Sequence, residues 1–291
     1  MPTPQMLMLR LLTTITALLL LTACSGMQLA YNTADFFIER YADDYLGLDS
    51  AQMERWSPRL KTALARHREE ELPYLATFFD SAQNDARKGF TRADVQCLLD
   101  QFEVIYRRHF TLAAAAAAPL LADLDKGQID ALQQRFREEA QEDAEDAARP
   151  KAVRVSKRVE RYTDNMRWWL GELTPKQRRI VRDVAADLPE TASWYAYRDR
   201  KRRELIALLR GGATSEDIER FLSDWLVDYT DMPAALADSQ VQLRAGMTDL
   251  LVRLDASFSD AQRRRLIDRL TGLRKDFLRL QQSPRMAPVT C

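Results

Sequence analysis

One local pattern that starts α-helices occurs six times along this chain. In each case Thr, Ser or Asp follows an apolar or small residue, and Gln or Asp stands three residues later. Such a pair forms a capping box, in which the first side chain accepts from a free backbone N–H and the second reaches back to the N-cap N–H. The six pairs are Asp49 with Gln52, Thr91 with Asp94, Asp125 with Gln128, Thr174 with Gln177, Thr214 with Asp217, and Ser259 with Gln262. They predict six helix starts.

Between these starts, apolar residues recur every three or four positions, for example over residues 95–112, 155–173 and 266–280. Narrow apolar stripes of this kind suit long helices that pack at shallow angles, and no run alternates with the period of a strand. Prolines within the intervals should kink or interrupt helices. The sequence therefore predicts an all-α protein of long, proline-kinked helices in an antiparallel bundle.

The first 23 residues have the pattern of a secretory signal peptide, with Arg10 ahead of the apolar run 11–23. As a helix this run is about 20 Å long, which is shorter than the roughly 30 Å of bilayer hydrocarbon. Residues 21–24 resemble the lipobox of bacterial lipoproteins, which implies cleavage before Cys24 and acylation of its thiol and amine. The alternative is an ordinary signal peptide followed by a chance cysteine.

In such lipoproteins an Asp after the lipidated cysteine favours the inner membrane, and here Ser25 follows Cys24. The resemblance thus implies an outer-membrane protein on the periplasmic face, attached to the membrane through its N-terminal lipid. The expected organisation is a signal peptide over 1–23, an all-α periplasmic domain over 24–282 and a flexible tail over 283–291.

Composition excludes some partners and leaves a disulfide open. The chain has 43 basic and 43 acidic residues, so it presents no large positive field for nucleic acid. Besides Cys24 there are two cysteines, Cys97 and Cys291. The periplasm permits a disulfide between them, but Cys97 also suits a helix core as a small apolar residue.

Aromatic and acidic residues are concentrated in residues 31–48. One interpretation is a binding face near the membrane, because Tyr and Phe are common interface anchors. The other is a first helix whose aromatic stripe packs on the bundle, and the sequence favours this one because large aromatics at helical spacing usually belong to a core. The candidate face comprises Tyr31, Phe36, Phe37, Tyr41, Asp43, Asp44 and Tyr45.

Two resemblances bear on the chain. Cys24, the segments 31–35 and 41–46 and the cap at Asp49 together resemble an uncharacterised family of proteobacterial lipoproteins, known as a domain of unknown function. That resemblance implies a lipoprotein of about this length and no activity. Residues 173–177, Leu-Thr-Pro-Lys-Gln, resemble the LTxxQ motif of periplasmic stress chaperones, which are small all-α proteins.

Strings of catalytic residues are missing from the sequence. The two histidines, His67 and His109, form neither an HExxH zinc motif nor the Glu-x-x-His of carboxylate metal sites. We expect His67 to form a surface ion pair with Glu70 or Glu71. His109 lies on an apolar stripe and is expected in the core or at a helix interface.

Charged runs at 138–146, 149–161 and 198–203 are interpreted as solvated, salt-bridged helix faces. No metal and no cofactor is predicted.

The sequence therefore favours a non-enzymatic binding or structural role in the envelope, with an envelope protein as one candidate partner. The alternative is an envelope enzyme that acts on peptidoglycan through carboxylates from separate helices.

Overall fold

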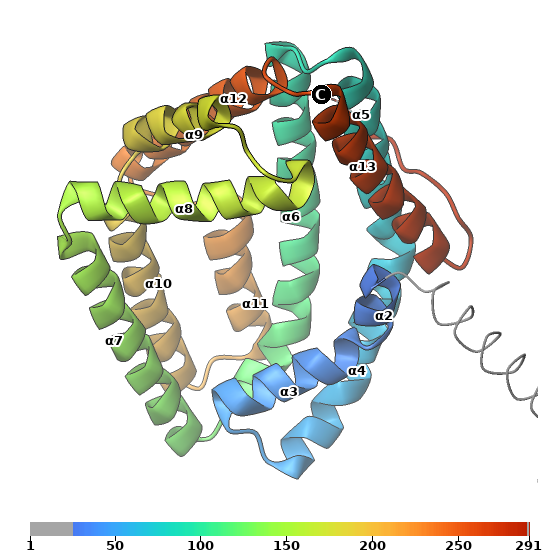
Figure 1. The fold of residues 1–291 in the computed structure, drawn as a ribbon. Helices are drawn as coiled ribbons and strands as arrows, with labels where there is room; N and C mark the ends of the chain where they lie inside the picture. Colours follow the sequence, from blue (N-terminus) through green and yellow to red (C-terminus); the bar gives the residue numbers. More distant parts are fainter. Residues whose placement is uncertain (1–25, 290) are drawn as a thin grey trace, which may run out of the picture.

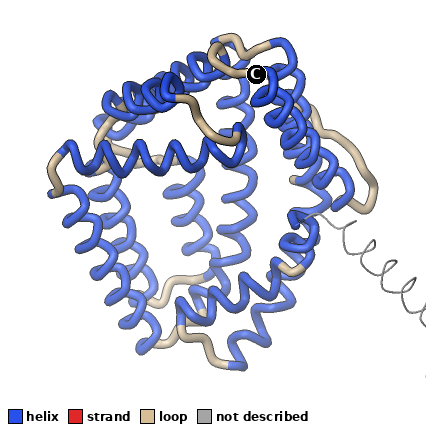
Figure 2. The backbone as a smooth tube through the Cα atoms, viewed as in Figure 1, coloured by secondary structure: helices blue, strands red, loops and turns tan. Residues whose placement is uncertain are grey.

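The computed structural model describes residues 26–289 and Cys291, and these residues form helices and loops without any strand (Figures 1 and 2). The all-α prediction is confirmed. The signal peptide and Cys24 lie outside the described residues. The helices are α2 (Gly26–Asn32), α3 (Ala34–Leu46), α4 (Ser50–Glu70), α5 (Leu72–Lys88), α6 (Arg92–Ala122), α7 (Lys126–Ala148), α8 (Lys151–Leu170), α9 (Pro175–Asp187), α10 (Ala192–Arg210), α11 (Ser215–Ser223), the π-helical turn η1 (Asp224–Asp228), α12 (Ala234–Asp255) and α13 (Asp260–Leu280).

All six predicted capping boxes are formed. They start α4, α6, α7, α9, α11 and α13, and in each the N-cap side chain and the side chain at N3 both make their hydrogen bonds to backbone N–H groups. At α9, for example, the Thr174 hydroxyl accepts from the Gln177 N–H at 3.2 Å, and the Gln177 side chain accepts from the Thr174 N–H at 2.9 Å. These starts are local features, which explains why three residues suffice to predict them.

Prolines divide most of the intervals between caps into helix pairs. Pro73 lies in the first turn of α5, and Pro150 and Pro233 are the N-caps of α8 and α12. At these positions the backbone N–H has no acceptor within the helix, so a proline costs no hydrogen bond. Pro58 and Pro119 lie inside α4 and α6, which are long enough to continue past them. The chain is thus a series of helices separated by short breaks, with α6 as a long single helix, and the main packing partners, such as α5 with α13 and α7 with α10, are distant in the sequence (Figure 1).

Neighbouring helices run antiparallel, as the sequence predicted. Asp80 of α5 pairs with Arg274 of α13 at 2.9 Å, while Ala86, further along α5, accepts from Arg263 at 2.7 Å. The residue number along α13 falls as the residue number along α5 rises, so the two helices run in opposite directions. Figure 1 shows them side by side along one edge of the molecule.

Two large apolar clusters form the core. One joins α6, α7, α10 and α11, with Leu132 and Ile218 fully buried at its centre. The other joins α5, α8, α9, α12 and α13 around Val181 and Leu250. In the part of the chain that the structure describes, no helix is both long and apolar enough to cross a membrane.

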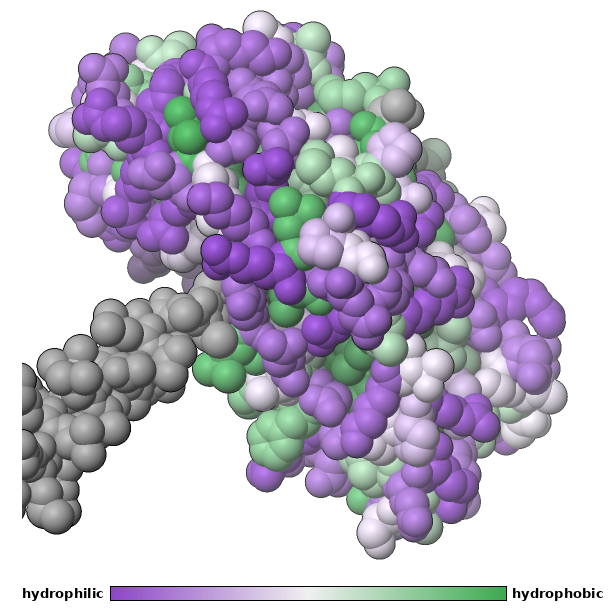
Figure 3. Space-filling model, turned by 90° about the vertical axis from the view of Figure 1, so that its right-hand side faces the viewer, coloured by the Kyte–Doolittle hydropathy of each residue, from purple (hydrophilic) through white to green (hydrophobic). Residues whose placement is uncertain are grey.

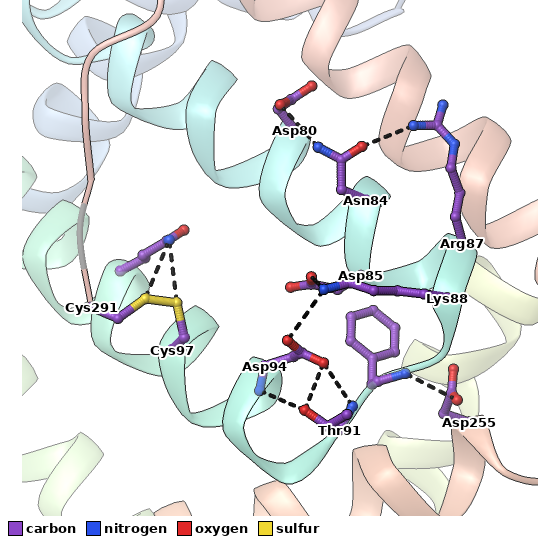
Figure 4. Close-up of polar contacts among 12 residues, drawn as sticks. Asp80, Asn84, Asp85, Arg87, Lys88, Thr91, Asp94, Cys97, Asp255 and Cys291 are labelled. Atoms are coloured by element: carbon purple, nitrogen blue, oxygen red, sulfur yellow. Dashed lines mark hydrogen bonds and ion pairs between the residues drawn. A yellow bond between two sulfur atoms is a disulfide. The ribbon is translucent and has the colours of Figure 1, made fainter.

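A disulfide ties the C-terminal segment to α6. Cys97 and Cys291 are bonded across 194 residues, with their Cα atoms 5.1 Å apart (Figure 4). This settles the alternative that the sequence left open. The segment also docks on α5, because the Ala287 N–H donates to the Pro73 carbonyl at 3.2 Å and its own carbonyl accepts from Thr77 at 2.5 Å. These contacts join the segment to α5, and the flexibility expected of residues 283–291 stays a prediction.

Candidate functional site

Helices α2 and α3 contact the rest of the protein largely through polar side chains. The Gln28 amide donates to the Asp276 carboxylate of α13 at 3.0 Å, and the Tyr31 hydroxyl lies 2.8 Å from Nδ1 of His67 on α4. About two turns further on, Glu39 accepts a hydrogen bond from Ser57 of α4. The inward side of this helical segment is therefore held by hydrogen bonds and by the Tyr31 ring, which packs on the cluster around Leu72, and the first buried residue is Ala42.

Large apolar side chains occupy the opposite side of the same segment. Leu29, Phe36, Phe37 and Tyr41 are each exposed by 61–67 %, and we call these four residues the outer face. The prediction that the aromatic stripe packs on the bundle is therefore wrong for Phe36, Phe37 and Tyr41. Figure 3 shows hydrophobic side chains on the surface close to where the described chain begins.

The helical repeat explains the outer face. Leu29 and Phe36 are seven residues apart, or about two turns, so they project to the same side. Ala42 and Leu46, which pack against the body, occupy the other side. Leu29 was not among the candidates predicted from the sequence, although its two-turn spacing from Phe36 indicates the shared side. The aromatic residues do not form one stripe, because the helical repeat divides them between two sides of the segment.

The remaining candidate residues do not share one role. The Tyr45 hydroxyl donates to Glu139 of α7 at 2.9 Å, and burial together with the Glu139 carboxylate raises the pKa of Tyr45 to about 12. Asp44 forms an exposed ion pair with Arg40 at 3.1 Å. The Asp43 carbonyl accepts from Gly47, whose left-handed conformation ends α3. Tyr45 thus docks the helix, while Asp43 and Asp44 remain exposed.

The two histidines meet in space although 42 positions separate them in the sequence. The rings of His67 and His109 lie edge to face with centroids 4.6 Å apart, and Nδ1 of His109 is 2.6 Å from the Ile105 carbonyl. The expected placement of His109 at a helix interface is confirmed. Burial, with His109 as a second cause, lowers the pKa of His67 to about 4, so its imidazole is neutral near pH 7.

The expected ion pair of His67 with Glu70 or Glu71 is wrong. Glu70 pairs with Arg66 at 2.8 Å. The Glu71 carboxylate is almost fully buried and accepts two hydrogen bonds from Arg108 of α6, at 2.6 and 2.9 Å. A guanidinium satisfies both oxygens of a buried carboxylate, which an imidazole cannot do.

Charged residues of α7 and α10 join the two helices instead of forming separate solvated faces. Arg198 pairs with Asp143 and Arg202 pairs with Glu139. Lys201 is buried and reaches Asp231 at 2.9 Å. The expected salt bridges are present, but many of them lie between helices distant in the sequence.

An open groove of about 450 Å³ lies between α6, η1 and α12. Aromatic side chains line it, including Phe102, Tyr106 and Tyr229, and the hydroxyls of the two tyrosines are 3.1 Å apart. The acidic groups in its lining, Glu103 and Asp228, both pair with Arg107, at 3.2 and 3.7 Å. The groove therefore has a largely aromatic lining, and its acidic side chains are neutralised by Arg107.

The pKa shifts of the described carboxyl groups do not point to a general acid. Wherever the pKa of a described carboxyl group is clearly shifted, it is shifted downward by hydrogen bonds and cationic neighbours, as for Asp130 beside Lys126 and Arg210. A general acid requires the opposite direction. Within the described residues, no group of three or more His, Cys, Asp or Glu side chains is arranged to hold a metal ion.

Comparison with known proteins gives one family assignment. No curated protein and no solved structure matches the chain. A family model matches residues 44–232, which begin near the end of α3 and include α4 to α11. The whole outer face thus precedes the matched region. Because the match covers more than half of the chain, the protein belongs to the family of unknown function DUF6279.

Proposed function

We propose that this protein is a lipid-anchored envelope lipoprotein with a non-enzymatic binding or structural role, in which the outer face of α2–α3 contacts another component of the envelope. The anchor is Cys24, and the domain faces the periplasm from the outer membrane.

The outer face carries the proposal. Leu29, Phe36, Phe37 and Tyr41 place three aromatic rings and a leucine in solvent on one short helical segment. Contiguous exposed apolar side chains on a soluble domain mark interaction surfaces, and Phe and Tyr are frequent anchors there. The same helical segment uses hydrogen bonds for docking, so the apolar residues are not needed to hold it in place.

The anchor rests on the sequence that precedes this face. Residues 1–23 have the charged start, apolar run and small residue of a lipoprotein signal, followed by Cys24. The Cys97–Cys291 disulfide supports an oxidising compartment, because such bonds persist in the periplasm and are rare in the cytosol.

Two measurements in cells test the proposal. Metabolic labelling with a fatty acid should label the wild-type protein, while Cys24→Ser should remain an unlabelled precursor. A photo-crosslinking amino acid at position 37 should form adducts that are absent when it stands at position 241, where Val241 is equally exposed on α12. Normal labelling of Cys24→Ser would refute the anchor. Identical products from both positions would refute the specific contact.

A further inference from the structure

We infer that the component covering the outer face of α2–α3 is the bilayer surface that carries the protein's own anchor. This inference rests on the proposed lipidation of Cys24. It names a phospholipid interface as the partner of Leu29, Phe36, Phe37 and Tyr41, and it gives α2–α3 the position of an interfacial helix beneath a periplasmic body.

Distance along the chain keeps the outer face near the anchor. Helix α2 begins at Gly26, two residues after Cys24. A helix rises 1.5 Å per residue, so Phe37 lies about 16 Å along the helix from Gly26, and the two steps from Cys24 to Gly26 add at most about 7 Å. Backbone hydrogen bonds from Thr33 to Leu29 and from Phe37 to Thr33 continue the helical path across the junction of α2 and α3. The two helices therefore keep their apolar side chains in a constant orientation close to the membrane.

The polarity of the segment is inverted relative to an ordinary surface helix. Gln28 and Tyr31 on the inner side make hydrogen bonds to α13 and α4, while Leu29 and Phe36 project away from the body. Helices of globular proteins normally bury their apolar side. An apolar side directed outward next to a lipid anchor is the arrangement of helices that lie in the membrane interface, with their apolar residues about 5–10 Å below the headgroups.

Side chains near the edge of the face suit the headgroup layer. Tyr41 is exposed and combines an apolar ring with a hydroxyl, and tyrosines are enriched at this depth. Its ring stacks on Tyr45 at 5.6 Å, which holds it on the α3 surface. Arg40 and Asp44 neutralise each other through their ion pair.

Charge decides which kind of lipid surface fits. Arg40 is the one basic residue within 26–46, whereas Asp35, Glu39, Asp43 and Asp44 make the segment net negative. Without a basic cluster, attraction to anionic lipid contributes little, so apolar burial must supply the contact. The contact should therefore weaken as the fraction of anionic lipid rises, and salt should screen this repulsion.

Fluorescence of the full, acylated protein in vesicles provides the test. Phe37→Trp and the control Val241→Trp are each reconstituted through the native anchor into phosphatidylethanolamine–phosphatidylglycerol vesicles, with or without brominated acyl chains. The signal of the native tryptophans, measured on the wild type, is subtracted. We expect the added emission at position 37 to shift to shorter wavelength and to lose most of its intensity with brominated lipid, and this loss should not decrease at high salt. The emission at position 241 should be unaffected.

Each other outcome has a separate meaning. If the protein floats with the vesicles and Trp emission at positions 37 and 241 is equally unquenched, the lipid contact is refuted while the anchor stands. Crosslinking of position 37 to a second copy or to another protein, with no quenching, would assign the face to that partner and also refute the inference. If the purified chain carries no acyl group at Cys24, the proposed function fails and this inference fails with it.

Discussion

The hydroxyl of Tyr31 lies 2.8 Å from Nδ1 of His67, and this hydrogen bond joins the helix next to the proposed anchor to the body of the protein. Burial raises the pKa of Tyr31 to about 12, so its hydroxyl keeps its proton and donates to the histidine. The imidazole must then be neutral at Nδ1, in agreement with the pKa of about 4 for His67.

This arrangement predicts loss of stability in mild acid. The pKa of His67 is about 4 in the folded protein and about 6.5 when unfolded. Between these values the unfolded state binds more protons, so the free energy of unfolding falls as pH decreases through 6.5 and the loss is complete below 4. The contribution of His67 amounts to about 3 kcal/mol. Denaturant unfolding at pH 7 and pH 4.5 should show a smaller difference for His67→Gln than for the wild type. An identical difference in both proteins would contradict the neutral buried histidine.

Truncation of the outer face should leave the fold intact. Phe37 is exposed and contributes little to the core, so Phe37→Ala should change the free energy of unfolding by less than about 0.5 kcal/mol. The matched core variant Leu250→Ala should cost about 2–5 kcal/mol, because Leu250 is fully buried. Thermal unfolding of both variants measures the contrast. A large loss with Phe37→Ala would show that this ring packs on the body.

Removal of the guanidinium from the buried ion pair should be costly. Arg108→Leu leaves the Glu71 carboxylate buried without its two hydrogen bonds, and we expect a loss of about 3 kcal/mol. The exposed pair of Arg40 with Asp44 provides the control, and Arg40→Leu should cost less than about 1 kcal/mol. Equal effects of the two substitutions in denaturant titrations would argue against a buried pair.

A single N-cap can be tested at the start of α9. The Thr174 side chain accepts from the Gln177 N–H, and Thr174→Ala should lower the free energy of unfolding by about 1 kcal/mol. Thr174→Ser keeps the hydroxyl and should be close to neutral. If the two variants melt alike, the cap makes no measurable contribution.

The disulfide should stabilise the protein by constraining the unfolded chain. Cys97 and Cys291 enclose most of the described sequence, so the double variant Cys97→Ser/Cys291→Ser should lose about 2–5 kcal/mol. A reductant should lower the melting temperature of the wild type and have no effect on the double variant. A wild type that is insensitive to the reductant would mean that the bond is not formed or does not contribute.

The helix starts and the fold class followed from the sequence because their causes are local. A capping box such as Thr91 with Asp94 needs only residues three positions apart, and both of its hydrogen bonds form in the structure. The antiparallel bundle was predicted from the apolar stripes of the helices, whereas tertiary packing decided which helices pair, such as α5 with α13. Prolines were informative as interruptions, and the structure showed which of them begin a helix and which are accommodated inside one.

Tertiary structure alone decided which side of each helix is covered. The residues around Phe37 are compatible with either a buried or an exposed stripe, and the polar contacts of Tyr31 and Gln28 with distant helices select the exposed one. The meeting of His67 with His109 and the bond of Cys97 with Cys291 likewise join positions far apart in the chain. Such contacts depend on how whole helices pack. The free energy of packing depends on side chains from several helices at once, so no short stretch of sequence determines these contacts.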